Sequence, residues 1–143
     1  MGLEDVYTEL VSEHSRCPEN RHPLDCATCS CKGHNPSCGD EITLHLDIAD
    51  GIVKDASFEG VGCAISQAST DMMVDLIRGK RTEEARALAQ KFIGMIKGEI
   101  TDEAELEDLD EALALKGVSH MPARVKCAVL AWHTLDEALK DEK

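Results

Sequence analysis

Aromatic and basic side chains are both scarce in this sequence of 143 residues. Aromatic residues make up 3% of the chain, so the core must be built mainly from Leu, Ile, Val, Ala and Met. The 15 Lys and Arg residues are outnumbered by 28 Asp and Glu residues, which gives a formal net charge of −13. This charge argues against nucleic acid or an anionic membrane as a partner, because binding phosphate requires clustered Lys and Arg.

Long apolar runs are missing as well. No window approaches the roughly 18 apolar residues of a membrane span, and the N-terminus has no basic-then-apolar signal region. Cysteine is abundant by contrast, with seven residues, an odd number that cannot all pair within one chain. We therefore expect a cytoplasmic protein, because clusters of cysteine in a reducing compartment indicate metal binding or catalysis rather than disulfides.

The length predicts a single domain over residues 1–143. Within it the clearest element is a β-hairpin, because apolar residues alternate cleanly over residues 41–49. The dipeptide Asp50-Gly51 follows and suits a type I′ turn. The return strand, residues 52–59, places Ile52, Ala56 and Phe58 on one face.

Apolar residues at helical spacing predict four further elements. Thr82 is the expected N-cap of the third helix, Pro122 suits the first turn of the last, and the acidic segment after residue 101 forms a weaker helix. A small antiparallel sheet covered by helices follows, which is an α+β sandwich. The four expected helices span residues 3–14, 63–78, 82–97 and 122–140.

Three cysteines lie in settings that favour a reactive or metal-binding thiolate. Cys38 lies in a turn just before the first hairpin strand, two residues from Asp40. Cys63 follows a glycine turn at the start of a helix, where the helix dipole favours the thiolate. Cys127 lies near the start of the last helix, close to the cations Arg124 and Lys126.

Each cysteine taken alone also fits a second interpretation, because a single cysteine among apolar residues is often a small inert core residue. The three signals strengthen one another only if the fold brings the residues together. Three thiolates and the Asp40 carboxylate can close a tetrahedral site, and soft sulfur ligands select zinc, copper(I) or iron–sulfur clusters.

A cysteine-rich segment at about residues 15–37 interrupts the helical pattern and has a short strand near its end. Four cysteines close together form a candidate second site for a metal or a cluster. Two alternatives remain open for them: sulfur relay or redox protection of the main site, for which Cys31 is the candidate, or a segment with no dedicated role. The four residues are Cys17, Cys26, Cys29 and Cys31.

Residues 35–40, 62–69 and 122–132, in this order and spacing, resemble the SufU/IscU family of iron–sulfur cluster assembly proteins, which includes the N-terminal part of NifU. Lys126 stands where IscU-type members carry histidine, and an extra segment near residues 103–119 matches a SufU-type insertion. The resemblance is therefore closer to the SufU branch. It implies a three-stranded antiparallel sheet packed against helices, with the cysteines converging at one exposed end.

By this resemblance the ligands of a zinc ion or a 2Fe–2S cluster are Cys38, Asp40, Cys63 and Cys127. The resemblance implies a protein that accepts persulfide sulfur from a cysteine desulfurase at Cys38 and supports cluster formation for apo iron–sulfur proteins. Such a sulfur carrier acts with the desulfurase rather than as a stand-alone enzyme. Two alternatives stay open: a scaffold that assembles and hands on a 2Fe–2S cluster, and a structural zinc module for protein interaction.

Overall fold

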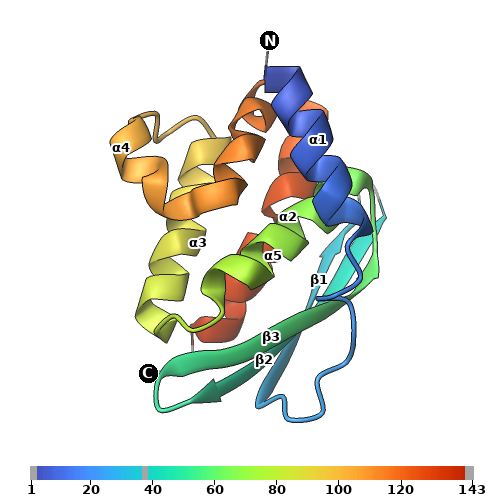
Figure 1. The fold of residues 1–143 in the computed structure, drawn as a ribbon, viewed down its shortest axis with the longest axis vertical. Coiled ribbons are helices and arrows are strands. Elements are labelled where there is room, and N and C mark those ends of the chain that lie inside the picture. The colour runs from blue at the N-terminus through green and yellow to red at the C-terminus, as the bar shows by residue number, and fades with distance from the viewer. Residues whose placement is uncertain (1–2, 37–38, 141–143) are drawn as a thin grey trace.

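A three-stranded antiparallel sheet supports the fold, in the order β1-β2-β3 (Figure 1). The computed structural model describes residues 3–36 and 39–140. The strands are β1 (Cys29–Asn35), β2 (Asp40–Ala49) and β3 (Ile52–Val61). The helices are α1 (Leu3–Arg16), α2 (Ala64–Ile77), α3 (Thr82–Ile96), α4 (Glu103–Leu106) and α5 (Pro122–Leu139), with the 3-10 helix η1 (Glu107–His120) before α5. The predicted α+β class and sheet are confirmed.

Helices α2 and α5 pack against the sheet; α1, α3 and η1 pack on this pair, and α4 packs on η1 and α3. Helix α1 contacts α2, while α3 and η1 contact α5 (Figure 1). Phe92 of α3 stacks on Trp132 of α5, with ring centroids 4.1 Å apart, so two of the few aromatic side chains join these helices. Within the described ranges, no helix is both long and apolar enough to cross a membrane.

The β2–β3 hairpin has the predicted type I′ turn, because Asp50 and Gly51 both have positive φ angles of 54° and 73°. The inner face of β3 differs from the prediction. Ile48 pairs with Val53 and Asp47 pairs with Asp55, so one extra residue of β3 has no partner in β2. This bulge turns Val53 into the core at 0% exposure and leaves Ile52 half-buried, so the placement of Ile52 on the inner face was wrong.

One helical prediction also needs correction, and the weaker helix expected in the acidic segment is present in two parts. The N-cap of α3 is Arg81, not Thr82, and no side chain in the described part of the chain caps this helix start. Backbone contacts with the hairpin fix the start instead, because the Thr82 N–H donates to the Gly51 carbonyl at 2.9 Å. The acidic segment forms the short helix α4 and then η1, which is interrupted at Asp110 by a φ of 53°.

Candidate metal centre

Asp40 is the first residue of β2 and has a fully buried side chain, with 0% exposure. Gly39 enters the strand with a φ of 71°, and its N–H donates to the Asn35 carbonyl at 2.9 Å. The Asp40 carboxylate accepts a hydrogen bond from the Cys63 backbone N–H at 3.0 Å. The carboxylate therefore connects the start of the hairpin to the start of α2.

Cys63 is the N-cap residue of α2, in an extended conformation, and no side-chain cap is present among residues 3–36 and 39–140. Its carbonyl accepts the first helical hydrogen bond, from the Gln67 N–H at 3.0 Å. Gly62 allows the approach of Asp40, since a Cβ at this position would lie 2.8 Å from the Asp40 Oδ1 atom. The glycine turn seen in the sequence is thus a steric requirement of the site.

Cys127 lies in the second turn of α5 and is 1% exposed. Helix α5 is held to α2 by two buried hydrogen bonds that share one hydroxyl group. The Trp132 indole N–H donates to the Ser69 Oγ at 2.8 Å, and this hydroxyl donates to the Ala128 carbonyl at 2.6 Å. Since Ala128 follows Cys127, these bonds fix the position of Cys127 relative to α2.

The ligand atoms of Asp40, Cys63 and Cys127 all lie within 4.8 Å of one another. The structure thus brings together three of the four predicted ligands, while Cys38 lies outside the described residues. Arg124 lies beside the two sulfurs. The negative charge of the Cys63 thiolate, followed by a hydrogen bond to Cys127, raises the pKa of Arg124, so this guanidinium remains charged.

The donor set of two sulfur atoms and one carboxylate oxygen fits a zinc ion, which binds Cys and Asp and takes four ligands. The same donors also fit an iron–sulfur cluster. Asp40, Cys63 and Cys127 therefore supply three metal ligands, and one further ligand is needed to close a tetrahedral site.

The other four cysteines occupy three different places. Cys29 and Cys31 lie on the half-buried face of β1 that packs on α5, and the Cys29 Sγ lies 4.0 Å from the Ala138 carbonyl. The exposed Cys26 contacts Asp47 from the loop before β1. This hydrogen bond raises the pKa of Cys26, which disfavours the thiolate that binds a metal.

Cys17 lies apart from these three, at a hollow beside His14. Among the described residues, neither candidate metal cluster includes any of the four cysteines. A second site made of all four stays a prediction.

Sequence reasoning missed a second group of side chains whose ligand atoms lie close enough together to hold a metal ion: His14, Asp71 and Asp75. His14 is 57 positions from Asp71 and comes from a different helix, so no local spacing connects them. Their only local signals are Asp71 and Asp75 themselves, which are one helical turn apart on α2 and share a face. Arg124 was noticed only as a cation near Cys127 in sequence.

Comparison with known proteins gave consistent matches over nearly the whole chain. The family model for the NifU-like N-terminal domain matches residues 6–143. The chain is 46% identical to the iron–sulfur cluster assembly scaffold protein IscU of Thermotoga maritima, over 98% of this chain and 96% of that protein. It is 39% identical to the zinc-dependent sulfurtransferase SufU of Bacillus subtilis, over 99% of this chain and 95% of that protein.

A solved structure is similar as well. It is a candidate iron–sulfur cluster assembly scaffold protein for the SUF system from Fervidobacterium islandicum, with a TM-score of 0.88 and 36% identity. The match covers 96% of this chain and 99% of that one.

Proposed function

The chain belongs to the NifU-like N-terminal domain family, and we propose that it is an iron–sulfur cluster assembly protein that accepts sulfur from a cysteine desulfurase. The observation that carries the proposal is the convergence of Asp40, Cys63 and Cys127, whose ligand atoms lie within 4.8 Å of one another. The family membership agrees with the SufU/IscU resemblance of the sequence. The relative from Bacillus subtilis is named a zinc-dependent sulfurtransferase, which supports sulfur transfer as the function in particular.

The proposed ligands of the metal ion are Asp40, Cys63 and Cys127, with Cys38 as the fourth. When bound, zinc would keep the cysteine ligands deprotonated and protect them from oxidation. The chain itself positions the ligands. The Cys63 N–H orients the Asp40 carboxylate, and the Arg124 guanidinium offsets the negative charge of the sulfurs.

Cys38 is the proposed sulfur acceptor. Its thiolate attacks the terminal sulfur of a persulfide on the desulfurase, and a new S–S bond forms at Cys38. The S–S bond of the donor breaks, and its electron pair leaves with the desulfurase cysteine as a thiolate. Cys38 then carries the persulfide, and a thiol reductant that supplies two electrons releases its outer sulfur as sulfide for clusters delivered to apo iron–sulfur proteins.

The test measures the turnover of a cysteine desulfurase on cysteine, with and without this protein. We expect the wild-type chain to raise the rate of alanine formation and to acquire a persulfide that can be detected by mass spectrometry. Cys38→Ser should abolish both effects. Cys26→Ser is the matched control, since Cys26 is an exposed thiol beside Asp47, outside the candidate centre. Unchanged desulfurase turnover with the wild-type chain would contradict sulfur transfer and support a structural zinc module.

A scaffold for a 2Fe–2S cluster is the second candidate function. The 46% identical relative from Thermotoga maritima is named a scaffold protein. The donor set can bind either a zinc ion or an iron–sulfur cluster. Anaerobic purification followed by iron and acid-labile sulfide analysis separates the two candidates. A colourless protein with one zinc per chain supports sulfur transfer, whereas stoichiometric iron and sulfide support a scaffold.

A further inference from the structure

A hollow between α1, α2 and η1 is lined by side chains that can all bind a metal ion. Its volume is about 210 Å³. The lining includes an imidazole, a thiol and four carboxylates, contributed by three separate segments of the chain. These residues are Glu13, His14, Cys17, Asp71, Asp75 and Glu111.

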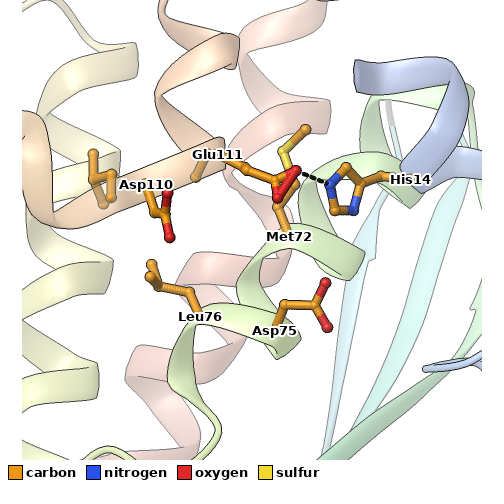
Figure 2. A pocket seen from close by; sticks show the side chains of 8 residues that line it. His14, Met72, Asp75, Leu76, Asp110 and Glu111 are labelled. Atoms are coloured by element: carbon orange, nitrogen blue, oxygen red, sulfur yellow. Dashed lines mark hydrogen bonds and ion pairs between the residues drawn. The ribbon is translucent and has the colours of Figure 1, made fainter. Parts of the chain in front are cut away.

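His14 is the centre of the group and is 9% exposed. Its Nδ1 lies 2.5 Å from the Asp71 Oδ2, and its Nε2 lies 3.1 Å from the Glu111 Oε1. One ligand atom from each of His14, Asp71 and Asp75 lies within 4.8 Å of the others. Figure 2 shows the His14 imidazole with the side chains of Glu111 and Asp75 close by, from the adjoining pocket.

Asn20 holds the two aspartates in place by hydrogen bonds. Its amide nitrogen donates to the Oδ1 of Asp71 at 2.9 Å and to the Oδ1 of Asp75 at 3.0 Å. Arg78 approaches the same Asp75 oxygen at 3.5 Å and donates to the Asn20 Oδ1 at 2.8 Å. The second oxygen of Asp71 contacts the His14 Nδ1, and a metal ion bound between these two atoms would replace that hydrogen bond. Such hydrogen bonds around metal ligands commonly fix their orientation.

The charge of the hollow favours a cation. Four carboxylates converge there, and Asp71 is 1% exposed, so water screens its charge poorly. The cationic groups beside them are His14, when protonated, and Arg78, which also pairs with Asp55 at 3.0 Å. A divalent cation would offset the remaining excess of negative charge.

We propose that this hollow binds a divalent first-row transition metal ion through His14, Asp71 and Asp75. Imidazole and carboxylate together suit zinc, iron(II) and manganese(II). The site is distinct from the candidate metal centre, because Asp71 follows Cys63 by eight residues, about 12 Å along α2. It includes one cysteine of the cysteine-rich segment at its edge, Cys17, but not the other three. The proposal stands independently of the proposed function.

The test uses a variant in which Cys38, Cys63 and Cys127 are all changed to serine, which removes the thiols of the candidate metal centre. Calorimetric titration of this variant with zinc should show one ion bound per chain. Adding Asp75→Asn should weaken this binding roughly tenfold or more, because it removes a carboxylate ligand. Even substitution of residues that only hydrogen-bond to metal ligands lowers metal affinity by about that factor. Asp55→Asn is the matched control, because it removes another carboxylate partner of Arg78 but does not line the hollow.

Two results would overturn the proposal: no zinc binding in the triple serine variant, or binding that Asp75→Asn leaves unchanged. If the triple variant fails to fold, the wild-type chain and its Asp75→Asn variant are titrated instead. Two ions per chain in the wild type and one in Asp75→Asn support the site. Equal stoichiometry and affinity in both proteins refute it. Asp75 is suited to this test because its side chain is 52% exposed, so the substitution does not disturb the core.

Discussion

The buried carboxylate of Asp40 has two roles, one in the structure and one in the chemistry of the candidate centre. As a hydrogen-bond acceptor it satisfies the Cys63 N–H at the start of α2, 3.0 Å away. As a charged oxygen donor it lies within 4.8 Å of the ligand atoms of Cys63 and Cys127. Two substitutions can separate the roles, because asparagine retains an oxygen acceptor but lacks the negative charge.

Asp40→Ala should reduce both stability and metal affinity. Leaving the Cys63 N–H without its acceptor costs about 1–3 kcal/mol in the free energy of unfolding. Loss of the carboxylate should lower zinc affinity by roughly tenfold or more. Asp40→Asn should lower zinc affinity with a much smaller loss of stability. Urea unfolding of the metal-free proteins and competition with a zinc indicator measure the two quantities. Wild-type zinc affinity in Asp40→Asn would show that Asp40 is not a ligand.

The sequence was sufficient to select the residues of the candidate centre but not to position them. Asp40 and Cys63 could be recognised from local sequence, because turn residues precede the strand that begins near Asp40 and a glycine turn precedes the helix that begins near Cys63. Their proximity to Cys127 depends on the packing of α2 against α5, which the Ser69 hydroxyl fixes through Trp132. Only the family resemblance predicted this convergence. The His14–Asp71 contact was not predicted at all, since it joins two helices through side chains far apart in sequence.

Among the elements, β3 shows why a period-2 pattern was not sufficient. Alternation assigns Ile52 to the core, but the unpaired residue in β3 reverses the faces and buries Val53. The bulge follows from the pairing of Ile48 with Val53, and the local sequence does not specify this register of the two strands. Helix α3 is similar, because the backbone of the hairpin, rather than the Thr82 side chain, sets its start.

Truncation of the two neighbouring residues tests the bulge. Val53→Ala should cost roughly 2 kcal/mol of unfolding free energy, since it removes two buried methyl groups and leaves a cavity. Ile52→Ala should cost clearly less, although it removes more atoms, because Ile52 is only half-buried. Urea unfolding monitored by Trp132 fluorescence measures both values. A larger loss for Ile52→Ala would place Ile52, not Val53, in the core.

An ion pair between α3 and α5 gives the stability a defined pH dependence. Arg86 Nε lies 3.0 Å from the Asp136 Oδ1. Burial alone would raise the pKa of Asp136, but hydrogen bonds with Arg86 and Gln90 outweigh it and hold this pKa below its ordinary value. Because the folded state binds the proton more weakly than the unfolded state, the contribution is complete above the unfolded pKa. It is lost as the pH falls through the folded pKa.

Asp136→Asn should therefore destabilise the protein at neutral pH and have a diminishing effect in acid. The pair is partly exposed to solvent, so we expect a loss of only about 0.5–1 kcal/mol near neutral pH. This difference from wild type should shrink as the pH falls below about 4, where the unfolded carboxylate takes up a proton. Urea unfolding of both proteins at several pH values provides the comparison. A difference that stays constant down to acid pH would exclude the ion pair as its source.

At the scale of the whole molecule, the candidate centre joins three segments that are distant in sequence. Asp40 begins β2, Cys63 precedes α2 and Cys127 lies within α5, so a metal ion bound by all three would connect the sheet to both helices that cover it. The unfolded chain does not hold these ligands together. Metal binding at this centre should therefore stabilise the folded state preferentially.

Removal of the metal should lower the melting temperature on the order of 10 °C. A ligand present at about a thousand times its Kd adds roughly 4 kcal/mol, and each kcal/mol corresponds to about 2–4 °C for a chain of this size. Differential scanning calorimetry with zinc and with a strong chelator measures the difference. Cys63→Ser should largely abolish it, because that variant lacks one ligand of the centre. The comparison is made in the Asp75→Asn background, so that metal in the hollow beside His14 does not contribute. An equal zinc-dependent shift with and without Cys63 would mean that the stabilising metal binds outside this centre. No shift in either protein would mean that the centre does not bind zinc more tightly in the folded state than in the unfolded state.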